Sequence, residues 1–387
     1  MKNTAEIKEC YGCGVCAAVC PRRLIDIVHN KDGFYHPIIE NLEICTECGL
    51  CLEVCSYLND CVENKPQSLK SYAAWSQNSV VRRICSSGGA GFEISRNLLE
   101  QGYKVCAVRY NSDANIAEHY IANTIEELLP SIGSKYIQSY TLKAFREIKR
   151  NEKYLIVGTP CQIDSLRRYI KRLRIEQNVV LIDFFCHGVP TYLIWDKYIN
   201  DVQSRIGKAS NVVWRHKKYG WHDSWAMSVD SLQSSQSEYS TVYGIRIKEM
   251  VCEHFSRMSQ GDDFYSLFLG NNCLNKACYN NCKFKYTNSS ADIRIGDLWG
   301  EEYKCNEEGV SALISLTPKG DDILLNLEGL EKLEHPLNVV AEGQMKDKIR
   351  YPYLARPIVL SMLKANFSLK NVAFVSRAFA KLRRIFK

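Results

Sequence analysis

The sequence has no run of roughly 18 or more apolar residues, so it predicts no membrane-spanning helix. Residues 1–13, MKNTAEIKECYGC, have no apolar segment of the kind a secretory signal requires, and we therefore expect a cytoplasmic protein. No G-x-G-x-x-G motif follows an apolar run, which argues against a nicotinamide-dinucleotide fold. The net charge of the chain is +7, and residues 370–387 contribute six of these positive charges, with six Lys and Arg and no acidic residue. The rest of the chain is close to neutral, so we expect no nucleic-acid surface.

Cysteine, in contrast, is abundant, with 18 in the chain. Thiols stay reduced in the cytoplasm, so this number indicates metal or redox chemistry rather than disulfides. Eight of them form two runs, CYGCGVCAAVCP and CTECGLCLEVCS, and Ser56 replaces in the second run the proline that ends the first. The first run holds Cys10, Cys13, Cys16 and Cys20, and the second holds Cys45, Cys48, Cys51 and Cys55.

Both runs have the spacing C-x2-C-x2-C-x3-C, which binds 4Fe-4S clusters with the fourth cysteine of each run on the other cluster. The spacing therefore predicts Cys10, Cys13, Cys16 and Cys55 on one cluster, and Cys45, Cys48, Cys51 and Cys20 on the second. Two zinc sites of four thiolates each are the alternative. We interpret residues 1–62 as a two-cluster ferredoxin domain, with a hairpin at residues 24–39 and KDG as its turn.

From about residue 70 the pattern alternates between helices and apolar strands. We expect helices at 91–102, 141–151 and 162–173, and strands at 104–110, 153–158 and 178–185. This alternation predicts an α/β fold with a mostly parallel sheet. The loops GTPCQ and CHGVP each follow a strand, and parallel strands bring such loops to one carboxyl edge, where ligands bind. Cys161 and Cys186 should thus lie beside a crevice, although small cysteines also pack in cores.

Three further cysteines, Cys273, Cys278 and Cys282, lie in CLNKACYNNC ahead of the expected strand SADIRIGDLWG. Their spacing is irregular, which alone is a weak metal signal. Together with Cys161 and Cys186 they give five candidates for a third site of four thiolates.

The stretches CSSGGAGF, GSKYIQS, VGTPCQ, FCHGVP and SADIRIGDLWG, in this order, resemble the coenzyme F-420 hydrogenase/dehydrogenase beta-subunit family up to about residue 335. The resemblance implies a flavoprotein that holds FAD beside a 4Fe-4S cluster and exchanges electrons with a partner molecule. It implies Cys161, Cys186, Cys278 and Cys282 as the ligands of that cluster. The segment between Cys278 and Cys282 is one residue longer than is usual in the family, which leaves Cys273 as a substitute ligand.

The same resemblance implies an FAD site made of Ser86, Ser87, Gly88, Gly89, Ser134, Lys135, Gly158, Thr159, Pro160 and Gln162. Ser-Ser-Gly-Gly at the start of a helix exposes backbone N–H groups that can bind a pyrophosphate. The alternative is an ordinary N-capped helix start, which has the same sequence pattern. Lys135 could neutralise a phosphate or the reduced flavin, and its alternative is a solvated surface charge. His187 could donate a proton to substrate or tune the cluster, or be structural. We take Lys135 and His187 as the candidate catalytic residues.

Arg215, Lys217 and Trp221 could hold a flat anionic substrate, but we favour a hairpin with exposed aromatic residues over 212–244 and a turn at 234–238. A last helix has one apolar face, made of Val372, Val375, Phe379, Leu382 and Phe386. We expect it to dock on its own protein, with contact to an anionic membrane as the alternative. The expected divisions are 1–62, a flavin-binding domain at 63–205, a part completing the cluster and substrate site at 206–335, and a basic helical tail at 336–387.

Together these observations predict an iron–sulfur flavoprotein oxidoreductase. Electrons would pass from a ferredoxin-type donor through 4Fe-4S clusters to FAD, and then to a small molecule such as an F-420-type deazaflavin. One alternative is a non-catalytic electron-transfer subunit of a larger redox complex. Another is a binding protein stabilised by structural zinc sites.

Overall fold

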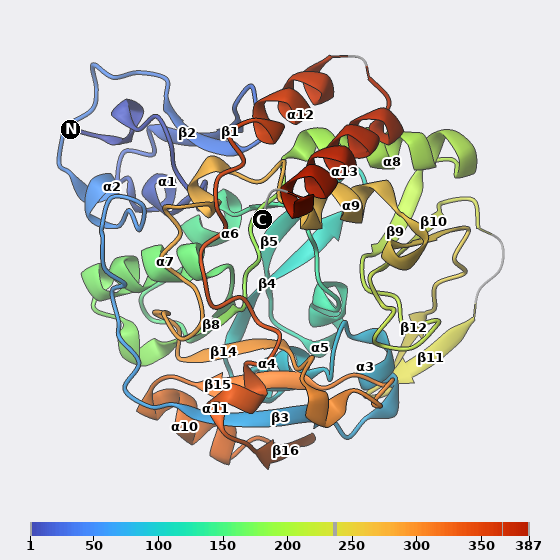
Figure 1. The fold of residues 1–387 in the computed structure, drawn as a ribbon. Coiled ribbons are helices and arrows are strands. Elements are labelled where there is room, and N and C mark those ends of the chain that lie inside the picture. The colour runs from blue at the N-terminus through green and yellow to red at the C-terminus, as the bar shows by residue number, and fades with distance from the viewer. Residues whose placement is uncertain (1, 235–237, 366, 386–387) are drawn as a thin grey trace.

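A nine-stranded sheet forms the centre of the molecule, seen here in a computed structural model that describes residues 2–234, 238–365 and 367–385 (Figure 1). Its strand order is β16-β3-β15-β14-β8-β7-β4-β5-β6. The strands are β3 (Lys70–Ser76), β4 (Lys104–Asn111), β5 (Ile116–Ala122), β6 (Ser139–Tyr140), β7 (Tyr154–Val157), β8 (Val179–Phe184), β14 (Ile293–Asp297), β15 (Ser311–Ser315) and β16 (Leu330–Glu334). The adjacent strands β4, β7, β8 and β14 are mutually parallel, whereas β15, β3 and β16 pair in antiparallel fashion, as β5 does with β4. The predicted α/β class is confirmed.

Helices cover both faces of this sheet because its strands are apolar on both sides. Along β7, Tyr154 and Ile156 belong to one hydrophobic core and Leu155 to the other. The first core is covered by α6 (Leu142–Arg146), α7 (Pro160–Leu173) and α8 (Tyr192–Ile206). The second is covered by α3 (Ser79–Ile84), α4 (Ala90–Glu100), α5 (Ile125–Leu128) and α10 (Pro318–Leu325). Burial on both faces is what a continuous apolar strand requires, so these strands were predictable.

The cysteine runs fold into a small module that packs against α6 and α7, at the upper left of Figure 1. It consists of α1 (Val15–Val19), β1 (Ile25–His29), β2 (Tyr35–Ile39) and α2 (Leu50–Glu53). The expected hairpin is confirmed, with His29 opposite Tyr35 across the turn. The side chain of Gln138 fastens the module to the body: its amide donates to the Tyr11 carbonyl at 3.0 Å and accepts from the Tyr35 N–H at 3.0 Å.

A second, three-stranded sheet covers one end of the body. It is made of β9 (Ala209–Val213), β10 (Ala226–Ser231) and β13 (His254–Arg257), and a hairpin of β11 (Tyr239–Val242) and β12 (Ile245–Lys248) lies beside it. The expectation of exposed aromatic residues here was wrong for the tryptophans, because Trp214 packs on Trp195 and Trp221 stacks on Trp299 with 4.6 Å between ring centroids. Residues 235–237 of the expected turn lie outside the described residues.

The chain ends in three helices, α11 (Leu337–Val340), α12 (Ala355–Lys364) and α13 (Leu369–Ile385). The short helix α9 (Asp263–Leu269) comes earlier, before β14. Single 3-10 turns occur along the chain at Thr4–Glu6, Leu129–Ser131, Glu176–Asn178, Met258–Gln260, Lys276–Cys278 and Glu301–Tyr303. The first half of α13 docks on α9, where Ser376 accepts a hydrogen bond from Asn272 at 2.8 Å. The side chains of Leu382 and Phe386 lie outside the described part of the chain. None of the described helices is long and apolar enough to cross a membrane.

Candidate functional site

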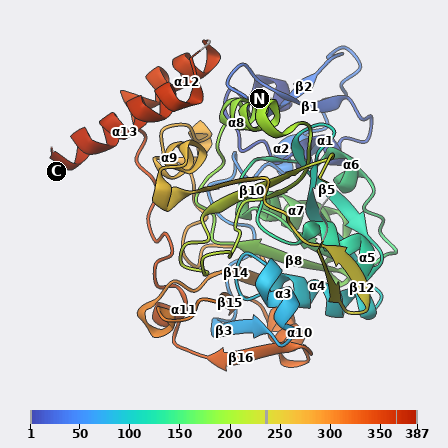
Figure 2. The ribbon, with the colours of Figure 1, turned by 90° about the vertical axis from the view of Figure 1, so that its right-hand side faces the viewer.

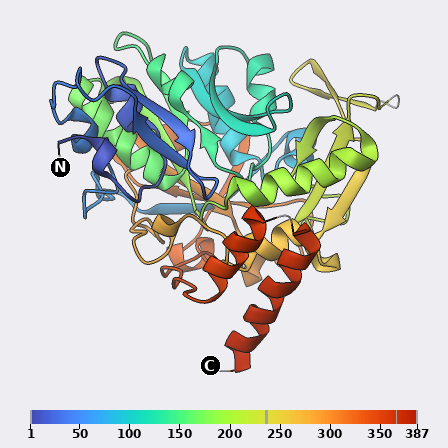
Figure 3. The same cartoon turned by 90° about the horizontal axis from the view of Figure 1, so that it is seen from above.

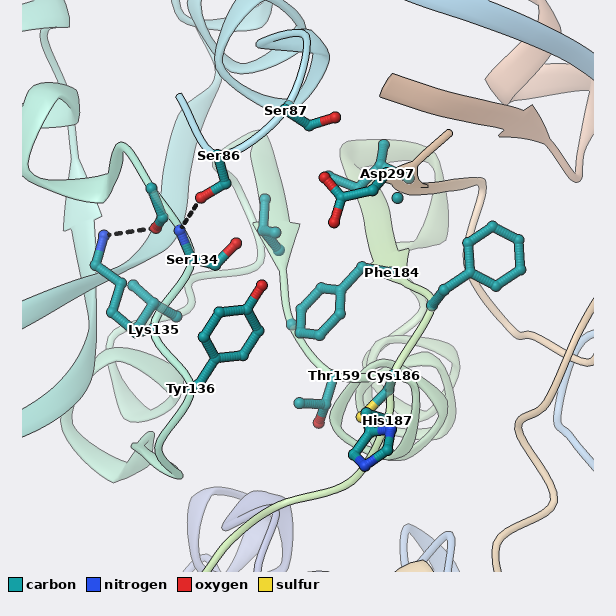
Figure 4. Close-up of a pocket in the computed structure, with 18 of the residues that line it drawn as sticks. Ser86, Ser87, Ser134, Lys135, Tyr136, Thr159, Phe184, Cys186, His187 and Asp297 are labelled. Atoms are coloured by element: carbon teal, nitrogen blue, oxygen red, sulfur yellow. Dashed lines mark hydrogen bonds between the residues drawn. The ribbon is translucent and has the colours of Figure 1, made fainter. Parts of the chain in front are cut away.

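A cavity of about 440 Å³ opens at the carboxyl ends of β7, β8 and β14 (Figure 4). It is lined by residues from 85–92, 131–139, 157–162, 184–190 and 295–299. These are the five segments that the sequence analysis selected, and the parallel strands bring them to one edge. The volume is in the range of small-molecule and cofactor sites.

The Ser-Ser-Gly-Gly turn forms one wall of the cavity, at the N-terminus of α4. Ser86 Oγ accepts a hydrogen bond from the Ser134 N–H at 2.7 Å, and the Ser87 hydroxyl donates to the Val310 carbonyl at 2.7 Å. A side chain at Gly88 would collide with the Ala74 carbonyl, so the turn lies directly on β3. Both serine side chains therefore hold loops in place, and the backbone of the turn is what borders the cavity.

Lys135 does not point into the cavity. Its ammonium nitrogen lies 2.9–3.0 Å from four backbone carbonyl oxygens, to which its three N–H groups donate: those of Pro130, Ser131, Ile132 and Gly133. In Figure 4 the side chain runs away from the centre of the site. Burial lowers its pKa to about 7. The expected neutralisation of a phosphate or flavin is therefore replaced by a structural role: the ammonium holds the 130–133 turn together.

The GTPCQ segment starts α7 instead of forming a free loop. Thr159 and Gln162 make a reciprocal capping box, in which the Thr159 N–H donates to Gln162 Oε1 at 2.8 Å. Pro160 occupies the first helical position, which needs no N–H donor. Gly158 lines the cavity at the end of β7. The cap places the Cys161 thiol 3.2 Å from the Thr159 hydroxyl, at the cavity wall.

Cys186 and His187 follow β8 and lie together on the floor of the site (Figure 4). Burial raises the pKa of Cys186 to about 11 and lowers that of His187 to about 4. The Lys285 ammonium donates to the carbonyls of both residues, at 2.7 and 3.1 Å, and its positive charge is held under this loop. His187 Nε2 is buried and makes no hydrogen bond within the described structure.

The thiols of four cysteines lie close together between this floor and the cysteine module: Cys161, Cys186, Cys278 and Cys282. Burial raises the pKa of Cys161 well above its ordinary value, and the charges of nearby Cys186, Cys13 and Cys278 raise it further. Burial, with the charges of Cys186 and Cys282, raises the pKa of Cys278 to about 12. All the cysteines are free thiols, so no disulfide joins the members of this group. An iron–sulfur cluster, which takes four thiolates, fits such a group.

Cys273 lies apart from this group. Its thiol donates to the Leu267 carbonyl at 3.4 Å, and the side-chain charge that acts on it belongs to Arg356 rather than to another cysteine. The structure therefore brings together Cys161, Cys186, Cys278 and Cys282 and leaves the substitute ligand outside.

The cysteine module encloses two further small cavities. Cys10, Cys13, Cys16 and Cys55 line one, and Cys20, Cys45, Cys48 and Cys51 line the other. These are the two crossed sets expected from the spacing. Within the described chain, no three His, Cys, Asp or Glu side chains stand close enough to hold one metal ion.

Tyr11 stands between the module and the main site. Its side chain lines both the Cys10 cavity and the main cavity, and its hydroxyl donates to the Asn281 carbonyl at 2.9 Å. The ring packs edge-on against Tyr57, with centroids 5.3 Å apart. Burial raises its pKa, and the charges of Cys161 and Cys282 contribute. We call the thiols around the Cys10 cavity the first group, those around the Cys45 cavity the second group, and Cys161, Cys186, Cys278 and Cys282 the third group. Tyr11 thus lies between the first and the third group.

Tyr136 and Asp297, which had no role in the prediction from sequence, form the opposite wall, and Arg215 lies behind them. The Arg215 guanidinium donates to Asp297 at 2.8 Å and to the Tyr136 hydroxyl at 3.2 Å, and lies over the rings of Trp225 and Trp299. Asp297 faces the cavity (Figure 4). Tyr136 and Asp297 belong to the GSKY and IGDLWG motifs, so their positions in those motifs were the available signal.

The hypothesis of an exposed Arg, Lys and Trp surface for an anionic substrate is corrected by the same contacts. Arg215 and Trp221 are buried. Lys217 donates to the carbonyls of Arg82, Ser87 and Glu308 at 2.6–2.7 Å. These charges are already partnered inside the protein.

The fold and the three thiol groups define an iron–sulfur redox protein in which a ferredoxin-like module is fused to an α/β body. Comparison with known families agrees: residues 9–59 match the 4Fe-4S dicluster domain. Residues 71–146 and 151–335 match the N-terminal and C-terminal parts of the coenzyme F-420 hydrogenase/dehydrogenase beta subunit. The chain belongs to this family.

Several relatives share part of the sequence. An uncharacterised protein of Methanocaldococcus jannaschii is 28% identical over 203 residues, covering 43% of this chain and 56% of that protein. The coenzyme F-420 hydrogenase subunit beta of Methanococcus voltae is 32% identical over 115 residues, or 26% and 40% of the two chains. The coenzyme F-420-dependent sulfite reductase of M. jannaschii is 27% identical over 168 residues, or 41% and 25%. The chain thus spans between a quarter and just over half of these relatives.

A solved chain of the F-420-reducing NiFe hydrogenase complex from Methanosarcina barkeri is also similar. The TM-score is 0.45 at 15% identity, over 84% of this chain and 94% of that one.

Proposed function

We propose that this chain is an iron–sulfur flavoprotein oxidoreductase. It carries electrons from a ferredoxin-type donor through the two clusters of the module and a third cluster to FAD in the main cavity, and from there to a small-molecule substrate. The single observation behind this proposal is the order of the three thiol groups in space.

The order runs from the surface inward. Cys48, in the second group of the module, is exposed to solvent. The first and second groups are neighbours, because the charge of Cys51 acts on Cys16. The first and third groups are neighbours in the same sense, because the charge of Cys13 acts on Cys161, which borders the main cavity. Such a series suits one-electron transfer toward a single acceptor at its inner end.

The main cavity has features that suit a flat dinucleotide cofactor. Gly133 has a positive φ of +81°, and a side chain there would meet only Ser86 Oγ, at 3.9 Å, so the backbone itself borders the open space. The wall formed by Tyr136 and Trp225 is aromatic, with stacked rings 5.0 Å apart. The N-terminus of α4 presents backbone N–H groups and the positive end of its dipole. FAD, when bound, supplies storage for two electrons and their release as a hydride.

The chain's own residues would then orient the reactants. Arg215 fixes the Asp297 carboxylate and the Tyr136 hydroxyl on one side of the cavity. His187 Nε2 lies buried without a hydrogen-bond partner among the described residues, near Cys186 on the other side. We propose that His187 contacts the substrate or the third cluster there. For the substrate we propose an F-420-type deazaflavin first, since two relatives carry this coenzyme in their names.

The test uses the full chain purified without oxygen. Bound FAD is released and quantified, and the reduction of F-420 or of an artificial acceptor by viologen-supplied electrons is followed by absorbance. Bound FAD with turnover supports the proposal. Clusters that can be reduced in a protein without FAD and without turnover would instead make the chain a non-catalytic electron-transfer subunit of a larger redox complex.

A further inference from the structure

The basic residues of this chain are concentrated in its last two helices and the segment leading to them. Residues 348–387 contain ten Lys and Arg and no Asp or Glu, whereas the whole chain has a net charge of only +7. All the residues before 348 are therefore net acidic. Such a charge asymmetry within one chain is typical of a segment that meets an anionic surface.

Large apolar side chains are exposed in the same place. In the described structure sixteen large hydrophobic residues are exposed, and five of them fall within residues 353–374. Tyr353 and Leu354 are each 75% exposed, Phe374 is 70% exposed, and Phe367 and Ile358 are 47% and 43% exposed. Scattered exposed apolar residues are normal, but such a concentration marks an interaction surface.

We call residues 353–381 the helical arm. The inner side of the arm packs on the body of the protein. Val359 and Val372 are fully buried, Ser376 accepts a hydrogen bond from Asn272, and Arg377 pairs with Asp263 at 3.1 Å. The outer side carries the five exposed residues named above; of these, Tyr353 packs edge-on against Tyr351, with 5.0 Å between ring centroids. Figures 2 and 3 show α12 and α13 on one side of the body, with α13 running outward from it. The protein therefore holds the arm in place and leaves its apolar side chains in water.

Lysines and arginines accompany these side chains. Lys348, Arg350, Lys370 and Lys381 are exposed on or just before the arm. Lys364 and Arg377 pair with Asp32 and Asp263 of the body. Helices that present Phe, Leu and Ile together with Lys and Arg lie in the interface of a bilayer, and anionic headgroups add attraction for each basic residue.

We propose that the helical arm binds the surface of a bilayer with anionic headgroups, with its exposed apolar side chains inserted among the lipids. An acidic protein would match the charge, but the five exposed apolar side chains are spread over α12, the segments flanking it and α13, and they form no continuous groove for it. A bilayer needs no groove, because each apolar side chain can insert separately among the lipids. This inference does not depend on the cavity, so it stands or falls separately from the proposed redox function.

Vesicle sedimentation of the full-length, cluster-loaded protein tests this proposal. The vesicles are phosphatidylcholine alone or phosphatidylcholine mixed with phosphatidylglycerol, at low and high salt. We expect binding to the mixed vesicles, weak binding to phosphatidylcholine alone, and less binding at high salt. Phe374→Ser and Leu354→Ser should each lower the partition into mixed vesicles about tenfold, which corresponds to part of the burial of one apolar side chain.

Leu325→Ser is the matched control, because Leu325 is 80% exposed on α10, outside the arm. It should leave binding unchanged, and all variants should retain the iron content of the parent protein. The proposal is overturned if the parent binds neither vesicle, if the control weakens binding as much as the arm variants do, or if salt abolishes binding that Phe374→Ser and Leu354→Ser leave intact. The last result would mean a purely electrostatic attraction without insertion.

Discussion

Three charged residues near the cavity show how tertiary contacts decide the role of a side chain. Lys135 and Lys217 donate to backbone carbonyls, and Arg215 is paired with Asp297. From the sequence all three were reasonable anion-binding groups. The carbonyls around Lys217 come from distant parts of the chain, such as Ser87 and Glu308, so no local sequence pattern indicates this contact. Those around Lys135 come from the preceding turn, but the sequence does not show that its side chain folds back onto them.

The assignment of cysteines to the third group can be tested through the iron content of the protein. Cys161→Ser or Cys278→Ser should each remove about four iron per chain, because each deletes a ligand of the third group. Cys273→Ser is the matched control, since Cys273 is also shielded from solvent but its thiol donates to the Leu267 carbonyl and lies apart from the third group. Iron and acid-labile sulfide are measured after anaerobic purification. A loss of iron from the Cys273 variant as large as from the others would contradict this assignment.

His119, which lies outside the cysteine groups, should make the free energy of unfolding depend on pH. Burial lowers its pKa to about 4, from an ordinary value of 6.5. The unfolded chain therefore binds more protons than the folded protein between these pH values, so the free energy of unfolding falls as the pH falls through this window. The slope is about 1.4 kcal/mol per pH unit in the middle of the window.

His119→Gln should flatten this dependence, because an amide can still donate to the Val157 carbonyl that His119 Nε2 contacts at 3.0 Å, but does not titrate. The measurement is the apparent thermal midpoint of both proteins near neutral pH and about two units lower. If the two midpoints fall by the same amount on acidification, His119 is not the cause.

At the scale of elements, the parallel centre of the fold was predictable and its edges were not. Strands β4, β7 and β8 were visible as apolar runs between amphipathic helices, because burial on both faces leaves little room for polar residues. The helix expected at 141–151 ends at Arg146 in the structure. The antiparallel strands β3, β15 and β16 join the sheet from distant parts of the chain, and such pairing leaves no signal in one sequence.

The docking of the cysteine module is a prediction at this scale. Gln138 is 4% exposed and bonds to the backbone of both Tyr11 and Tyr35, so Gln138→Ala leaves two buried backbone groups unpaired. Each such group costs about 1–3 kcal/mol. We expect faster hydrogen exchange at residues 10–40 with little change in α8. Gln101→Ala, at the exposed end of α4, is the control. Unchanged exchange in the Gln138 variant would show that other contacts hold the module.

At the scale of the whole molecule, the sequence indicated the thiols but not their order in space. Spacing predicted the crossed sets of the module, and the structure places both around separate cavities. That Tyr11 borders both the first group and the main cavity depends on the docking of the module against residues 278–284, which are distant in sequence. The three groups form one series only because that docking occurs.

The central claim is that this series ends at a flavin. The most direct test is the content of iron, acid-labile sulfide, zinc and released flavin in the anaerobically purified full chain. The account predicts about twelve iron, about twelve sulfide and one FAD per chain, with no zinc. About eight iron without flavin would contradict it, since the module would then hold its two clusters while the thiols at the main cavity held none.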